Sequence, residues 1–199
     1  MTIKAREAPA ANAAVLSKGL NDVAPLRGRE SLLGGSEVAA TMRPIPLYSV
    51  GLDNLAEGMG LEGAEQIGWR YLVYGTQAVG IADLDDKGGE GAPRFSAFSE
   101  GERAKCLNSA LKYAEDKYQS GDNIYDVRIL EIPSLYSTAV WLAGNSNIFI
   151  PFMDNGKLCQ IGSVDQAQFL SELINLASKQ RQLLHDDDRT LDEGYLEPH

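Results

Sequence analysis

One stretch of the sequence limits the possible folds more than any other. From Ile132 to Met153 the chain carries no charged residue, and this length could span a lipid bilayer. Pro133 and the polar residues at 144–147 interrupt the stretch, and a polar turn inside a bilayer would leave backbone groups without hydrogen-bond partners. We therefore predict a buried β-hairpin with strands over residues 136–142 and 148–152, and no membrane span.

Two amphipathic helix patterns flank this hairpin. Ser99 and Glu102 have capping-box spacing, and the apolar residues behind them recur at intervals of three and four residues. These apolar positions are Ala104, Leu107, Leu111, Ala114 and Tyr118. A second capping-box spacing begins at Ser163, with apolar positions from Phe169 to Ala177 behind it. The sequence predicts a helix at each place, and a weaker helix over residues 52–67.

The other apolar segments have the pattern of strands. They cover residues 69–74, 78–84 and 127–132. The predicted order is α-β-β-α-β-β-β-α, and successive hairpins favour antiparallel pairing. We therefore predict the α+β class, with a mainly antiparallel five-stranded sheet and two or three helices.

The two ends of the chain differ from the middle in composition. Residues 1–43 are rich in Ala, Gly and Ser and carry a charge near +2, whereas residues 185–199 are acidic, near −5. Neither segment has enough apolar residues to offset the entropy of ordering. We predict a flexible N-terminal arm over 1–43, an α+β domain over 44–184, and an acidic C-terminal tail over 185–199.

Charge and histidine content exclude several functional classes. The net charge of −10 disfavours binding to nucleic acid or to anionic membranes. The only histidines, His185 and His199, lie in the tail, so the predicted domain has no histidine base or histidine metal ligand. Gly58–Gly63 matches GxGxxG but does not follow a strand, so we expect no nucleotide cofactor. We expect a cytoplasmic protein, because no secretory signal is present and the two cysteines are isolated.

One acidic cluster is a candidate binding site for a ligand or an ion. It consists of Asp83, Asp85, Asp86 and Glu90. When Asp83 is counted as the first ligand of a calcium loop, Lys87 and Arg94 occupy positions that require oxygen ligands. A solvated loop or weak binding of a divalent ion therefore both remain open, and we predict no specific metal site.

Large aromatic residues of the hairpin are candidates for an interface. Tyr136, Trp141 and Phe149 lie on predicted strands, and such residues are enriched at contact centres. With no catalytic motif in the sequence, we predict a non-enzymatic protein-interaction or assembly subunit, which binds a protein partner or a second copy. The alternatives are a module that binds a small ligand or a divalent ion, and an enzyme using Glu131 or the Asp83 cluster.

Overall fold

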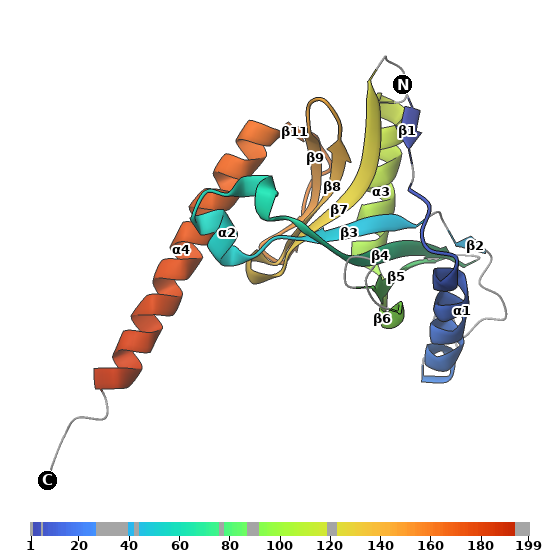
Figure 1. Cartoon of the computed structure of the whole chain (residues 1–199), viewed down its shortest axis with the longest axis horizontal. Helices are drawn as coiled ribbons and strands as arrows, with labels where there is room; N and C mark the ends of the chain where they lie inside the picture. The colour runs from blue at the N-terminus through green and yellow to red at the C-terminus, as the bar shows by residue number, and fades with distance from the viewer. Residues whose placement is uncertain are drawn as a thin grey trace, which may run out of the picture.

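The computed structural model describes residues 2–4, 6–26, 40–41, 44–75, 78–86, 92–118 and 123–193. They form an α+β fold in which helices cover a large, curled mixed sheet (Figure 1). The α+β prediction is confirmed. None of the helices in these residues is both long enough and apolar enough to cross a membrane.

The sheet contains long strands and several short ones. They are β1 (Thr2–Lys4), β2 (Ala40–Thr41), β3 (Ile45–Ser49), β4 (Glu65–Tyr74), β5 (Val79–Asp85), β6 (Arg94–Glu100), β7 (Ile124–Ile132), β8 (Ser137–Ala143), β9 (Ile148–Asp154), β10 (Lys157–Leu158) and β11 (Val164–Asp165). The helices are α1 (Ala11–Val23), α2 (Leu52–Ala56), α3 (Glu102–Tyr118) and α4 (Gln166–Glu193). Short 3-10 turns cover Ala24–Leu26, Gly60–Gly63 and Pro133–Leu135.

Along the main path of the sheet, two antiparallel halves meet at one parallel strand pair, and β1, off this path, also pairs with β7 in parallel. The main path of the sheet is β10-β9-β8-β7-β3-β4-β5-β6, and β3 pairs with β7 in parallel. The predicted sheet of five mainly antiparallel strands is instead a larger mixed sheet that includes parallel pairs, and the described residues form four α-helices instead of two or three. The prediction missed β3, a short strand that contains Pro46, and it missed β6, a polar edge strand. Reasoning from successive hairpins also cannot detect a parallel pair whose strands are far apart in sequence.

Helices cover both faces of the sheet. On one face α3 buries Ala104, Leu107, Leu111 and Ala114 against strands from both halves, as its apolar pattern predicts. On the opposite face, α2 and α4 pack over the β7–β9 half, and α1 packs over the β4–β6 half. The hydrophobic core therefore has three parts on one continuous sheet.

The helix starts differ in detail from the predicted capping boxes. Ser99 belongs to β6, and α3 begins after Gly101, whose carbonyl accepts hydrogen bonds from the amides of Ala104 and Lys105. Gly101 has φ +104°, a conformation that favours glycine. At α4 the cap is Asp165, whose carboxylate accepts from the amide of Gln168.

Both terminal segments contribute helical structure. Within residues 1–43, for which we predicted a flexible arm, α1 buries Leu16 and Leu20 against the sheet. Gly19 lies against Phe95 of β6, so closely that a Cβ at this position would overlap the ring. At the other end, α4 continues past residue 184 to Glu193.

Candidate functional site: an acidic pocket at the centre of the sheet

Two β-bulges lie close together where the halves of the sheet meet. In the β3–β4 pair, Leu47 is opposite Gly68 and Tyr48 is opposite Gln66, so Ile67 has no partner. In the β5–β6 pair, Asp83 and Leu84 are opposite Ala97 and Phe95, so Ser96 has no partner. An extra residue in a strand bends the strand and redirects its side chain, which is why bulges often occur next to binding sites.

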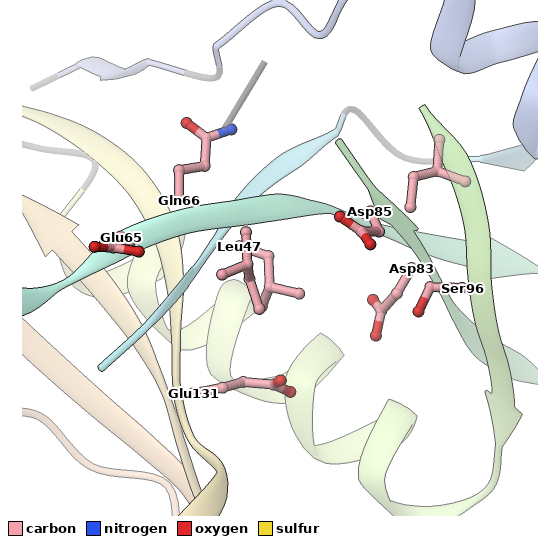
Figure 2. Close-up of a pocket in the computed structure, with 9 residues that line it drawn as sticks. Leu47, Glu65, Gln66, Asp83, Asp85, Ser96 and Glu131 are labelled. Carbon is pink, nitrogen blue, oxygen red and sulfur yellow. The ribbon is translucent and has the colours of Figure 1, made fainter. Parts of the chain in front are cut away.

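Both bulged residues line the same pocket. Its volume is about 520 Å³, and it is lined by Leu47, Glu65, Gln66, Ile67, Asp83, Leu84, Asp85, Ser96 and Glu131. These residues come from five strands, β3 to β7, and Figure 2 shows Asp83 and Ser96 on neighbouring strands with Glu131 across from them. Leu47 and Ile67 add apolar side chains to this lining, so the pocket is not lined by acidic side chains alone.

A buried arginine holds two of the pocket carboxylates in place. Arg70 lies on β4 directly opposite Asp83 on β5, and its Nε and Nη2 donate to the two oxygens of Asp83, each at 2.7 Å. Its Nη2 also donates to Glu131 at the end of β7, at 2.6 Å. Arg103, in the first turn of α3, donates to the same oxygen of Glu131 at 2.5 Å. This network joins β4, β5, β7 and α3.

Because Arg70 is buried, loss of its ion pairs would lower the stability of the fold. The Arg70 side chain is 1% exposed, whereas those of Asp83 and Glu131 are each 18% exposed. Burial acts to lower the pKa of Arg70, but the hydrogen bonds and charges of Asp83 and Glu131 outweigh it, and the net pKa is raised. Arg70 therefore stays charged, and it fixes both carboxylates at the pocket wall.

The charge of the pocket is negative. Glu65, Asp83, Asp85 and Glu131 supply four carboxylates to its lining, and no lysine or arginine is among the lining residues. Arg70 and Arg103 contact Asp83 and Glu131 and offset two of the four charges. The carboxylates and the apolar surface of the lining together suit a cationic group with an aliphatic stem.

The predicted acidic cluster divides between two places. Asp83 and Asp85 line the pocket. Asp86 instead accepts a hydrogen bond from the Trp69 indole on the opposite face, where it is buried. Glu90 lies outside the described residues. Within those residues, no group of three or more His, Cys, Asp or Glu side chains is arranged to hold a metal ion.

The three predicted interface aromatics also have different environments. Tyr136 is 69% exposed and adopts φ +49°, beyond the 3-10 turn that follows β7. Trp141 and Phe149 are buried, and Phe149 stacks on Phe169 of α4 with ring centroids 4.2 Å apart. Contact with a partner through these two residues would require α4 to move, whereas Tyr136 is accessible as it stands.

Sequence reasoning identified part of the pocket. It named Asp83 and Asp85 as a candidate ligand site and Glu131 as a candidate catalytic residue, without relating the two. It missed Arg70, although a single charge inside the apolar run from Trp69 to Tyr74 is a signal for a buried ion pair. No sequence pattern indicates the bulges at Ile67 and Ser96, because a bulge exists only relative to the pairing with a neighbouring strand.

Comparisons with known proteins do not assign this chain to a family. No protein-family model, curated protein or solved structure matches this chain.

Proposed function

We propose that this chain is a non-enzymatic protein-interaction protein whose acidic pocket accepts a lysine or arginine side chain from a basic segment of a partner protein. One observation carries the proposal. The bulged residues Ile67 and Ser96 line one pocket, and the lining of this pocket contains four carboxylates and no basic side chain. A negative pocket of this kind attracts cations and repels nucleic acid.

The apolar lining favours a long basic side chain as the occupant. The methylene groups of lysine or arginine can lie along Leu47 and Ile67 while the charged end meets the carboxylates. Asp85 and Glu65 stand at the end of β5 and the start of β4, where a partner backbone would approach. The net charge of −10 would also steer a basic partner towards the protein.

The hydrogen bonds within the network support binding over acid–base catalysis. Both oxygens of Asp83 accept from Arg70, and Glu131 accepts from Arg70 and Arg103 through one oxygen. Each Asp83 oxygen accepts a hydrogen bond from the buried Arg70, so this carboxylate is held in one orientation at the pocket wall. These carboxylates act in our proposal as fixed negative charges.

A small cationic molecule is a second candidate occupant. The pocket volume of about 520 Å³ lies within the range of small-ligand sites. Agmatine carries the same guanidinium group as an arginine side chain but has no peptide backbone. If agmatine binds the full chain as tightly as a basic peptide does, the small-ligand function is the correct one.

The proposal is tested by measuring the binding of a labelled hexa-arginine peptide to the full chain by fluorescence anisotropy. The variant Glu65→Gln/Asp85→Asn removes two pocket charges and keeps Asp83 and Glu131, which hydrogen-bond to Arg70. We expect it to weaken binding about tenfold, and Ser96→Arg, which places a cation in the pocket, to weaken it at least as much. Added salt should weaken binding to the unmodified chain.

The matched control is Glu115→Gln/Asp116→Asn on the exposed side of α3. It removes the same net charge, and neither residue lines the pocket. We expect its affinity to stay within about twofold of the unmodified chain. Equal weakening by the two double variants would show that net charge, and not the pocket, attracts the peptide, and the proposal would fail.

A further inference from the structure

A second polar cluster lies further along α3 than the acidic pocket. Lys117 donates hydrogen bonds to the hydroxyl oxygens of Tyr113 and Ser163, each at 2.8 Å. These two hydroxyl oxygens are 3.3 Å apart, within hydrogen-bond distance of each other. Tyr113 and Lys117 are one helical turn apart on α3, and Ser163 lies directly before β11. The three groups therefore meet between α3 and the segment that leads to α4.

The charge of Lys117 is held beside these hydroxyl groups and not beside a carboxylate. Among the described residues, no Asp or Glu forms an ion pair with Lys117. Its ammonium lies 5.2 Å from the ring centroid of Tyr113 and 5.5 Å from that of Tyr118, both within cation–π distance. The positive charge is therefore not neutralised by an acid and acts on the Tyr113 hydroxyl.

This environment favours the phenolate form of Tyr113. Its hydrogen bonds with Lys117 and Ser163 lower the pKa of Tyr113, whereas burial raises the pKa of Tyr71 and Tyr74. The hydrogen bond with Tyr113 also raises the pKa of Lys117, so the ammonium stays charged at neutral pH. Tyr113 packs against the core and remains partly exposed, so its position is fixed while reagents in solution can reach it.

We propose that Tyr113 is a nucleophilic phenol and a site of covalent O-acylation by activated acyl donors. The phenolate oxygen attacks the carbonyl carbon of the donor, a new oxygen–carbon bond forms, and the bond from that carbon to the leaving group breaks. The phenol proton goes to water, and the leaving group takes up a proton from water. Lys117 acts as a positioning residue, because it stays protonated and stabilises the phenolate.

This site is separate from the acidic pocket. Tyr113 lies ten residues after Arg103, about 15 Å along the axis of α3, and Arg103 is the α3 residue that contacts the pocket residue Glu131. The acylation of Tyr113 and the binding of a basic partner at the pocket can therefore fail independently.

The test treats the full chain with N-acetylimidazole at neutral pH and maps the acetylated residues by mass spectrometry. We expect Tyr113 to be acetylated faster than Tyr136, which is 69% exposed but accepts no hydrogen bond from a lysine in the part of the chain that the structure describes. Neutral hydroxylamine removes an acetyl group from a phenol but not from an amine. It therefore distinguishes modification of Tyr113 from modification of Lys117.

Substitution of Lys117 tests the cause of the reactivity. Lys117→Met should slow the acetylation of Tyr113 at least about threefold, because the loss of phenolate outweighs the higher nucleophilicity that accompanies a higher pKa. Lys117→Arg keeps the positive charge and should retain most of the rate. Lys105→Met is the matched control, because Lys105 lies on the same helix but pairs with Glu102, and it should leave the rate unchanged.

Two results would overturn the proposal. One is acetylation of Tyr136 at the same rate as Tyr113 or faster. The other is an unchanged rate at Tyr113 in the Lys117→Met variant, with circular dichroism showing that its helix content equals that of the unmodified chain.

Discussion

Arg70 places a positive charge at the centre of a hydrophobic sheet. The residue before it on the strand, Trp69, and the residue two positions after it, Leu72, are buried in separate parts of the core. A buried charge is tolerated when it is paired, and Asp83 and Glu131 supply the opposite charges through Nε and Nη2, while Nη1 has no hydrogen-bond partner among the described residues. The same carboxylates give the pocket wall its charge, so at this residue the stability of the sheet and the chemistry of the site depend on one another.

Replacement of Arg70 should therefore be strongly destabilising. We expect Arg70→Met to lower the free energy of unfolding by about 3 kcal/mol, because it leaves the partly buried Asp83 without its cation and Glu131 with Arg103 alone. Urea denaturation of the full chain measures this loss. Adding Asp83→Leu should recover part of it, since the pair is then replaced by apolar groups.

An exposed ion pair on α3 provides the comparison for this experiment. Lys105 contacts Glu102 at 2.7 Å, with both side chains more than half exposed. Lys105→Met should change the free energy of unfolding by less than about 0.5 kcal/mol. Similar losses for Arg70→Met and Lys105→Met would show that the Arg70 network does not stabilise the sheet.

At the scale of the elements, α1 depends on one close contact with the sheet edge. An ideal Cβ at Gly19 would lie 2.0 Å from a ring carbon of Phe95 on β6. Gly19→Ala favours the isolated helix by about 1 kcal/mol, but it forces the helix away from the strand. We expect weaker docking, seen as faster amide hydrogen exchange in α1 and β6.

Gly162→Ala is the control for this substitution. No atom lies within 4 Å of an ideal Cβ at Gly162, and the residue is outside every helix and strand. We expect the amide hydrogens of this variant to exchange at the same rates as those of the unmodified chain. Unchanged exchange of α1 in the Gly19→Ala variant would mean that the contact with Phe95 does not hold the helix.

The elements that could be predicted are those whose signal is local. The apolar stripe of α3 and the hairpin of β8 and β9 are visible because each repeats with the period of its own structure. The short strand β3 and the polar edge strand β6 were missed because only their neighbours in the sheet stabilise them. Helix α1 was missed for a similar reason, since its few buried residues matter only against β5 and β6.

The pocket belongs to the scale of the whole molecule. Its lining comes from five strands, and these adjoin one another only because β3 pairs with β7 in parallel and joins the two antiparallel halves. Asp83 and Glu131 are far apart in the sequence but bind the same arginine. The sequence identified both as chemically interesting, but their convergence depends on the complete sheet and could not be predicted from local patterns.

The overall charge of the molecule offers a competing place for a basic partner to bind. The acidic residues that follow Leu184 could attract arginine through charge alone, without any pocket. The most direct test is to titrate the ¹⁵N-labelled full chain with the hexa-arginine peptide and to follow its amide resonances. Our account predicts saturable shifts at Glu65, Gln66, Ile67 and Ser96, the residues at the bulges. Shifts confined to residues 185–199, or no shifts in β4 and β6, would contradict it.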